Sequence, residues 1–148
     1  MEIIRVPDHD KRSHMDMLLM ADEQESMIER YLERGELYAL YDDDLRALCV
    51  VTDEGKEVFE IKNLIVKPEY RRMGYGRRLV EYVLASYQLW GTVMLVGTGD
   101  VPQTLRFYEQ CGFVRSHIVK NFFVEHYDYP LFEEGRQLVD MIYLKKPL

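Results

Sequence analysis

The sequence of 148 residues has little of what several classes of protein require. Its two cysteines, Cys49 and Cys111, stand in no CxxC or Cys/His spacing, which excludes a disulfide framework and disfavours a zinc site. We expect both to be packing residues in a reduced, cytoplasmic protein. The apolar stretch 15–21 is short and contains Asp16, so neither a signal peptide nor a membrane span is expected.

Basic residues are also in the minority, because 19 Lys and Arg face 26 Asp and Glu and give a net charge of −7. Nucleic-acid binding needs clustered Lys and Arg against phosphates, so we expect no such partner. The chain is 47% hydrophobic and 30% charged, a balance typical of globular rather than disordered proteins. Its length predicts one domain over residues 1–148.

The negative charge is unevenly distributed along the chain. Residues 1–41 hold ten acids and five bases, and residues 42–60 hold seven acids and two bases. Residues 62–78 reverse the sign, with six bases and one acid. One basic segment in an acidic chain predicts a local anion site rather than a surface for polyanions.

Hydrophobic periodicity and turn residues predict a mixed α/β chain without internal repeats. The first two helices are expected at 8–20, capped by Asp8 or Asp10, and at 22–34, where Gly35 ends the second. Two later helices are expected, one after Gly76 to about 89 and one capped by Asp100 that ends at Cys111. The expected strands are 2–6, 37–41, 45–52, 58–66, 92–96, 113–123 and 137–144.

Two of these strands have unusual patterns. The strand at 58–66 alternates in its first half and then runs apolar through Leu64, Ile65 and Val66, which indicates a β-bulge there. The strand at 92–96 is apolar throughout, as expected at a sheet centre that is covered on both faces.

The segment Arg71–Gly76 (RRMGYG) follows a strand and begins a helix. Its glycines allow a ligand to approach the backbone, and free N–H groups at the positive end of a helix favour an anion. We interpret it as a phosphate or pyrophosphate site; the alternative is a glycine-rich turn with a solvated arginine face. The spacing matches neither a Walker motif nor a dinucleotide fingerprint, which disfavours a nucleotide-binding module.

The stretch 64–76 (LIVKPEYRRMGYG) resembles the acetyl-CoA motif of the GNAT N-acetyltransferase superfamily, with its [QR]-x-x-G-x-[GA] signature. Downstream, 108–113 (YEQCGF) resembles the family's Y-E-x-x-G-F. The chain is similar to a small, single-domain bacterial-type member. The resemblance implies an α/β (α+β) GNAT fold, in which a mixed, mostly antiparallel sheet contains two splayed central parallel strands, 57–66 and 92–97, flanked by about four helices.

The resemblance further implies acetyl-CoA as co-substrate and no metal. Ile65 and Val66 would offer backbone groups to the pantetheine arm. The pyrophosphate would be cradled by the backbone of Arg71, Arg72, Met73, Gly74, Tyr75 and Gly76, with Arg77 reaching a phosphate. One departure concerns Asp100, which stands near the start of the second-motif helix, where many relatives have a cofactor-contacting Asn or Ser.

By the same resemblance, Tyr108 is the proton donor to the departing thiolate, which a phenol of pKa ~10 can protonate. Glu60, fourteen residues before Gly74, is the expected general base that takes the amine proton. Glu57 and a water relay remain alternatives. A purely structural interpretation makes Glu60 a solvated strand carboxylate paired with Lys62.

The family builds its acceptor side from the first two helices and the segment before the last strand. In this chain both regions combine acids with aromatics, which suits a cationic amine or is simply an acidic surface. These residues are Asp22, Glu23, Glu25, Tyr127, Asp128, Tyr129, Phe132, Glu133 and Glu134, and His126 lies among them.

The predicted function is therefore acetyl transfer from acetyl-CoA to a primary amine in a ternary complex. A small cationic amine is the first expectation for the acceptor, and a peptide or protein amine is the second. A different class, a non-catalytic acyl-CoA-binding sensor, stays open. The resemblance also favours a homodimer, whereas the acceptor itself is not encoded in any motif.

Overall fold

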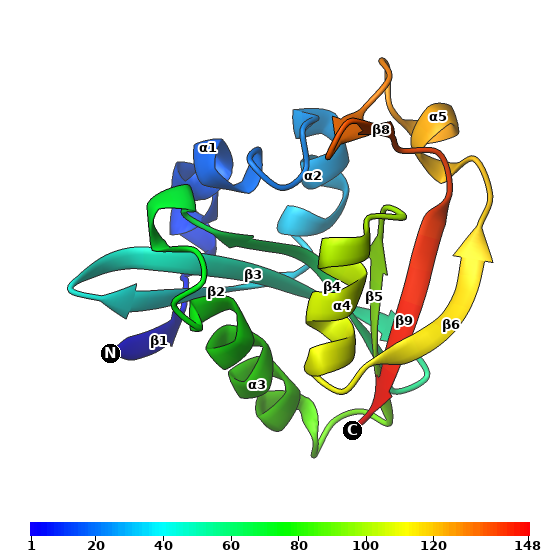
Figure 1. Cartoon of the computed structure of the whole chain (residues 1–148). Coiled ribbons are helices and arrows are strands. Elements are labelled where there is room, and N and C mark those ends of the chain that lie inside the picture. The colour runs from blue at the N-terminus through cyan, green and yellow to red at the C-terminus, as the bar shows by residue number, and fades with distance from the viewer.

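The computed structural model describes residues 1–148 and is built on one seven-stranded sheet with helices on both faces (Figure 1). Every neighbouring pair of strands is antiparallel except β4 and β5, which are parallel. This confirms the expected mixed, mostly antiparallel sheet. In spatial order the strands are β1 (Glu2–Arg5), β2 (Glu36–Asp42), β3 (Asp44–Gly55), β4 (Val58–Val66), β5 (Val93–Thr98), β9 (Met141–Pro147) and β6 (Val114–Val119).

Five α-helices and two 3-10 helices accompany the sheet, one α-helix more than the sequence predicted. The added helix is α5, inside the segment expected to be a strand and a loop. A two-stranded hairpin, β7 (Phe132–Glu133) with β8 (Arg136–Gln137), follows it. The helices are η1 (Asp8–His14), α1 (Met15–Leu18), α2 (Glu25–Leu32), η2 (Pro68–Tyr70), α3 (Tyr75–Tyr87), α4 (Pro102–Gln110) and α5 (Phe122–His126).

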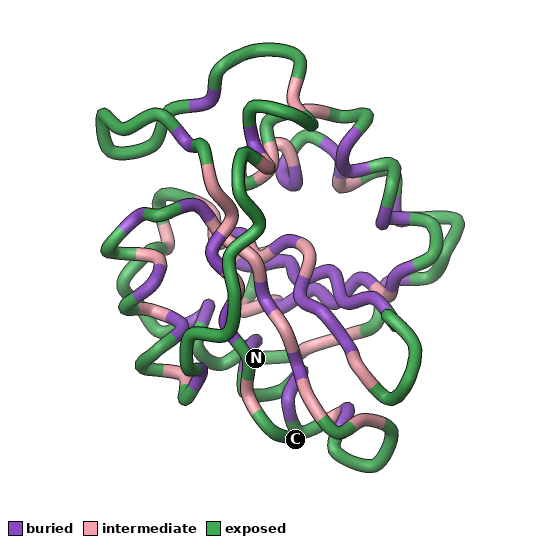
Figure 2. The backbone as a smooth tube through the Cα atoms, turned by 90° about the vertical axis from the view of Figure 1, so that its right-hand side faces the viewer, coloured by how far each residue is buried: buried purple, intermediate pink, exposed green.

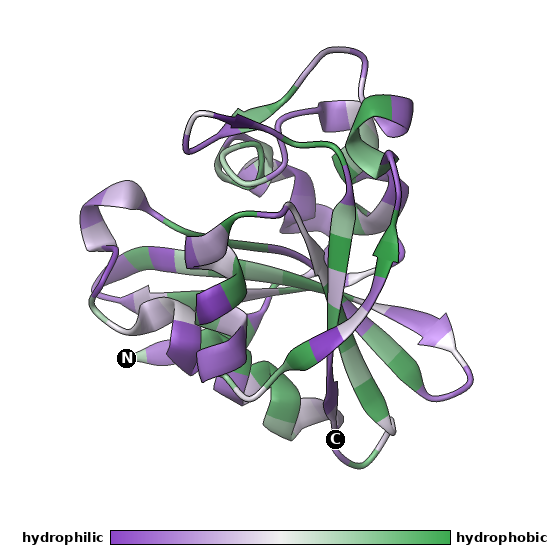
Figure 3. Ribbon diagram, turned by 45° about the vertical axis from the view of Figure 1, so that its right-hand side comes forward, coloured by the Kyte–Doolittle hydropathy of each residue, from purple (hydrophilic) through white to green (hydrophobic).

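Each face of the sheet has its own core. Residues of α3 and α4 pack with one face and include Leu79, Val83 and Leu105, whereas α1 and α2 pack on the other face through Leu18 and Ile28. Figure 2 shows the buried residues concentrated along the central strands and on the inward sides of the helices. Figure 3 shows the same helices with hydrophobic stripes beside hydrophilic ones, the pattern that amphipathic helices need.

Three predicted helix starts are wrong. The first helix is a 3-10 segment at Asp8–His14 with only a short α1 after it, and neither acid caps it. Lys11, which is 3% exposed, donates to the Leu32 and Gly35 carbonyls at 3.2 and 2.6 Å, and the Asp8 carboxylate pairs with Lys11 Nζ at 3.0 Å and does not cap the helix. The second helix begins at Glu25 instead of 22.

The third wrong start concerns α4. Val101 precedes its first turn and no side chain caps it, so the predicted capping role of Asp100 is not realised. Pro102 at the first helical position supplies a fixed φ and lacks the N–H that a cap would satisfy. The helix therefore begins without the carboxylate of Asp100.

The central strands separate beside a bulge. On β3, Val51 pairs with Ile61 but Val50 pairs with Asn63, so Lys62 is the extra residue on β4. The bulge thus lies two residues before the apolar run that predicted it. That run reflects burial on both faces, because Leu64 packs toward α3 and Ile65 toward α1. The last residue pair between β4 and β5 is Ile61 with Val96, directly before the bulge at Lys62.

Candidate active site

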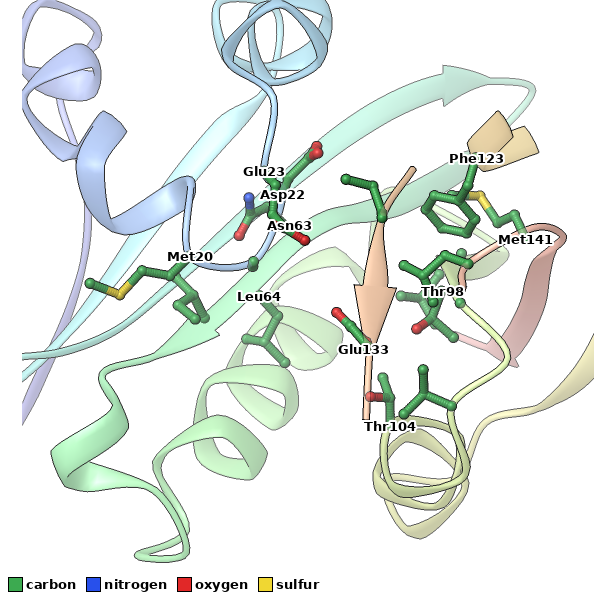
Figure 4. Close-up of a pocket in the computed structure, with 18 of the residues that line it drawn as sticks. Met20, Asp22, Glu23, Asn63, Leu64, Thr98, Thr104, Phe123, Glu133 and Met141 are labelled. Carbon is green, nitrogen blue, oxygen red and sulfur yellow. The ribbon is translucent and has the colours of Figure 1, made fainter. Parts of the chain in front are cut away.

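A cavity of about 480 Å³ opens where β4 and β5 separate (Figure 4). Its walls include residues 61–65 of β4 and 96–99 of β5 and the turn after it. Further walls come from the α1–α2 loop at 20–23, from α4, and from the segment between α5 and β9. Because the inner edges of β4 and β5 have no partner strand here, their backbone groups are available to a ligand.

Tyr108 of α4 lies on the wall of this cavity. It is 6% exposed and packs edge-on against Phe107 and Phe113, with ring centroids 5.1 and 5.7 Å away. Its hydroxyl has no hydrogen-bond partner in the protein, and burial raises the pKa of Tyr108 above the ordinary value for a phenol. The hydroxyl therefore stays protonated at neutral pH and can donate a proton or a hydrogen bond.

Glu60 is buried on the opposite side of β4 from the α3 core and is not on the cavity wall. Its carboxylate accepts a hydrogen bond from the Tyr143 hydroxyl at 3.0 Å and pairs with Lys62 Nζ at 3.0 Å. The purely structural interpretation expected a solvated carboxylate paired with Lys62; the pairing is found, but the carboxylate is buried. Glu57 is exposed in the turn before β4, at the other end of the paired segment from the cavity.

The loop before α3 presents a run of unused donors. Arg72 and Gly74 adopt left-handed backbone conformations, with φ of 62° and 87°, and Gly74 directly precedes α3. The N–H groups of residues 72–77 have no acceptor within the protein. Arg71 adds a cationic side chain on the cavity wall. Such a loop at a helix N-terminus fits a phosphate-rich anion.

Several residues predicted to bind the cofactor point their side chains elsewhere. The Tyr75 hydroxyl donates to Asp42 Oδ2 at 2.6 Å, and Arg77 Nε donates to Glu81 Oε1 at 3.0 Å along the surface of α3. Met73 is 59% exposed. The backbone N–H groups of these residues have no acceptor in the protein, which leaves them free for the contacts that the resemblance implied for Met73 and Tyr75; for Arg77 it implied a side-chain contact.

Three further predicted residues pack the site together. A Cβ on Gly76 would lie 3.3 Å from Val66 Cγ2 and 3.4 Å from the Phe107 ring, so glycine lets α3 approach both β4 and α4. Ile65 is buried toward α1 and also lines the cavity. Val66 packs toward the α3 core. The ligand contacts proposed for Ile65 and Val66 involve backbone groups on the unpaired edge of β4.

A chain of hydrogen bonds forms the other end of the cavity. The hydroxyls of Tyr31 and Tyr127 donate to the two carboxylate oxygens of Asp22, at 2.8 and 2.5 Å. Asn63 Nδ2 donates to the Tyr31 hydroxyl and to the Leu18 carbonyl, both at 3.1 Å. Burial raises the pKa of Asp22 above its usual range, although both hydroxyls favour the ionised form.

Sequence reasoning missed Tyr31 and Asn63. Tyr31 has the spacing of an ordinary apolar residue on the buried face of α2, and only its hydroxyl distinguishes it. Asn63 had a detectable signal, because it is a buried amide that directly precedes the apolar run 64–66 of a central strand. Figure 4 shows Asn63 grouped with Asp22 and Glu23, across the cavity from Thr98 and Met141.

The segment after α5 is tied to the α1–α2 loop at three points. Besides the Tyr127–Asp22 contact, the Asp128 N–H donates to Gln24 Oε1 at 2.9 Å, and the Tyr129 hydroxyl donates to the Glu23 carbonyl at 2.7 Å. We call residues 127–129 the strap. Glu133 and Glu134, just beyond it, line the cavity, while His126 does not and packs on Phe122.

The splayed strands and the donor-rich loop define a class of protein that holds a CoA ester between two central strands. The chain belongs to the acetyltransferase (GNAT) family, whose model matches residues 5–113. It is 35% identical over 132 residues to YvbK, an uncharacterized N-acetyltransferase of Bacillus subtilis (strain 168), covering 87% of this chain and 85% of that protein.

Two solved structures agree with this assignment. A Bacillus subtilis acetyltransferase in complex with CoA has a TM-score of 0.90 and 32% identity, over 99% of this chain and 98% of that one. A GNAT family acetyltransferase from Elizabethkingia anophelis with acetyl-CoA bound has a TM-score of 0.93 and 31% identity, over 99% and 97%. The protein is an N-acetyltransferase that uses acetyl-CoA as co-substrate, which confirms the resemblance read from the sequence.

Two further structural findings concern membranes and metal ions. None of the helices is long and apolar enough to cross a membrane. No three His, Cys, Asp or Glu side chains are grouped in a way that could hold a metal ion.

The donor-rich loop generates a prediction with a matched control. Gly74 and Gly55 have φ of 87° and 85°, and a Cβ on either would meet no atom within 4 Å. We expect Gly74→Asp to weaken CoA binding about 10- to 100-fold, because its carboxylate competes with phosphate for the same N–H groups. Gly55→Asp carries the same backbone strain and should bind CoA normally.

Calorimetric titration with CoA checks this, with thermal unfolding of both variants to compare stability. Equal CoA affinity in Gly74→Asp and the parent protein would remove this loop from the cofactor site.

Proposed function

We propose that this enzyme acetylates the primary amino group of a small cationic molecule. The observation that carries the proposal is the lining of the cavity: four carboxylates, from Asp22, Glu23, Glu133 and Glu134, share it with Tyr108. Ion pairing and hydrogen bonding to these groups favour a protonated amine over a neutral or anionic acceptor.

The strap supports a small acceptor over a polypeptide. Its three hydrogen bonds to the α1–α2 loop join the two segments that border the acceptor end of the cavity. A connection between these two segments favours a small molecule, which needs only one opening, over an extended peptide that lies across the site. The cavity of about 480 Å³ also lies within the range of small-molecule sites.

Acetyl transfer to an amine forms one C–N bond and breaks one C–S bond. The amine nitrogen gives up a proton, and the departing sulfur takes one up. Tyr108 is proposed to hold the proton for sulfur: it lines the cavity, its hydroxyl has no competing partner, and its raised pKa keeps it protonated. Backbone N–H groups on the unpaired edge of β4 could stabilise the negative carbonyl oxygen that develops.

Glu60 is proposed as the base, acting through water. It lies on β4 beside Ile61, the last residue paired with β5, and its burial beside Lys62 keeps a carboxylate close to the point of separation. Because Glu60 is not on the cavity wall, direct contact with the amine is not part of the proposal. Glu57 is a weaker candidate for the base, because it is exposed and lies at the far end of the paired segment from the cavity.

The cofactor roles are carried over as proposals in the same way. The N–H groups of the loop Arg71–Gly76 would bind the pyrophosphate, and the unpaired backbone at Ile65 and Val66 would bind the pantetheine arm. The Arg77 side chain supports a phosphate contact only if it leaves Glu81.

A panel of acceptors tests the proposed function. Release of the free CoA thiol from acetyl-CoA would be measured with small diamines and monoamines, amino acids, and short peptides with free N-termini or lysines. We expect turnover with small cationic amines and little with peptides. Preference for peptides would favour the protein-acetyltransferase alternative, and tight acetyl-CoA binding with no turnover would favour a non-catalytic sensor.

Tyr108→Phe tests the proton donor. We expect kcat to fall about 100-fold while CoA affinity stays the same, because the variant removes only the hydroxyl. Tyr87→Phe is a suitable control, since its hydroxyl is bonded to that of Tyr38 on the far side of the core. Unchanged kcat in Tyr108→Phe would exclude the residue from proton transfer.

Glu60→Gln tests the base. We expect kcat to fall about 100-fold, because the amide cannot take up the proton of the amine. Glu36→Gln removes another paired carboxylate, that of the surface pair with Arg5, and serves as the control. An unchanged kcat in Glu60→Gln would assign the base to another group.

A further inference from the structure

Asn63 is a buried amide whose orientation is fixed by its neighbours. It is 4% exposed, and its Nδ2 group donates to the Leu18 carbonyl and to the Tyr31 hydroxyl, both at 3.1 Å. A backbone carbonyl can only accept, so the nitrogen and not the oxygen must face Leu18. Both hydrogens of the amide are therefore committed.

The carbonyl oxygen of the same side chain is left without a partner. Asn63 Oδ1 is the one side-chain nitrogen or oxygen in the protein that is fully inaccessible to solvent and has no hydrogen bond. Native proteins rarely leave such an atom unsatisfied, because its desolvation is not compensated. Asn63 lines the same cavity as Tyr108 (Figure 4), and the oxygen itself is fully buried, so a donor from the cavity reaches it only with a small movement of the side chains around it.

The neighbouring groups show what kind of donor fits. The hydroxyls of Tyr31 and Tyr127 both donate their hydrogens to the Asp22 carboxylate, at 2.8 and 2.5 Å. The side chains of Asn63, Asp22 and Glu23 at this end of the cavity consequently offer acceptors: Asn63 Oδ1 and the two carboxylates. A ligand that binds here must supply the hydrogens, and the carboxylates favour one that also carries positive charge.

Resting on the proposed acceptor class, we propose that Asn63 Oδ1 accepts an N–H of the incoming primary amine and positions it in the cavity. Tyr31, through its hydrogen bond to Nδ2, holds the amide in the orientation that leaves this oxygen without a partner. An alkylammonium group has three N–H donors, enough to engage Asn63 and a carboxylate together. An alcohol has one donor and no charge, so it should bind much more weakly.

Two substitutions at one position separate a binding role from a structural one. Asn63→Leu and Asn63→Asp both remove the amide hydrogens that bond Leu18 and Tyr31, but only leucine also removes the acceptor oxygen. We expect Asn63→Leu to raise KM for the amine about 10- to 100-fold with a smaller change in kcat. Asn63→Asp should keep KM within about threefold of the parent, because a charge-bearing oxygen remains.

The control is Thr52→Val. Thr52 is 1% exposed on the neighbouring strand β3, donates to Glu54 Oε2 at 2.6 Å, and does not line the cavity. It loses one buried hydrogen bond and should keep the KM of the parent. Equal rises of KM in the leucine and aspartate variants would overturn the proposal, since only the structural bonds are lost in both.

A second measurement needs no turnover and so is independent of the proposed function. n-Butylammonium chloride would be titrated into the 15N-labelled protein with CoA bound, while the side-chain amide resonances of Asn63 are followed by NMR. We expect these resonances to shift in a saturable way, and n-butanol at the same concentrations to leave them unchanged. No shift with n-butylammonium, or an equal shift with n-butanol, would overturn the proposal even if the enzyme acetylates amines.

Discussion

The loss of pairing between β4 and β5 is the constraint on which the site depends. The extra residue at Lys62 shifts the register of β4, and pairing with β5 stops at Ile61 and Val96. Beyond that point two central strands of a buried sheet keep unpaired edges, which would be unfavourable without a ligand. The cavity, the cofactor loop that follows β4 and the position of Tyr108 all adjoin this opening.

The charge of the chain is arranged around the same opening. The basic segment 62–78 supplies the loop with free N–H groups and Arg71 at the cofactor end. The opposite end is acidic through residues from two distant segments, 22–23 and 133–134. The net charge of −7 is thus the sum of opposed regions, each matched to one substrate: an anionic CoA ester and, by our proposal, a cationic amine.

Rigidity at the acceptor end comes from hydrogen bonds rather than from regular structure. Asp22 lies in a loop, yet hydroxyls from α2 and from the strap fix both of its oxygens. The same network reaches β4 through Asn63. Three segments that are far apart in the sequence therefore hold one another, and a change in any of them should be felt at the acceptor site.

The sequence determined the order of the seven strands of the main sheet and of the helices between them, the sheet class, the glycine-containing loop before α3 and the family, because each depends on local patterns: alternation, glycine spacing and the motifs at 71–76 and 108–113. Only the tertiary structure decided that Glu60 meets Tyr143 and that Asp22 meets Tyr127 and Tyr31. Nor could periodicity distinguish the hydroxyl of Tyr31 or the unpartnered oxygen of Asn63 from ordinary buried positions. Local patterns report which face a residue occupies, whereas an acceptor site is made by contacts between faces brought together by folding.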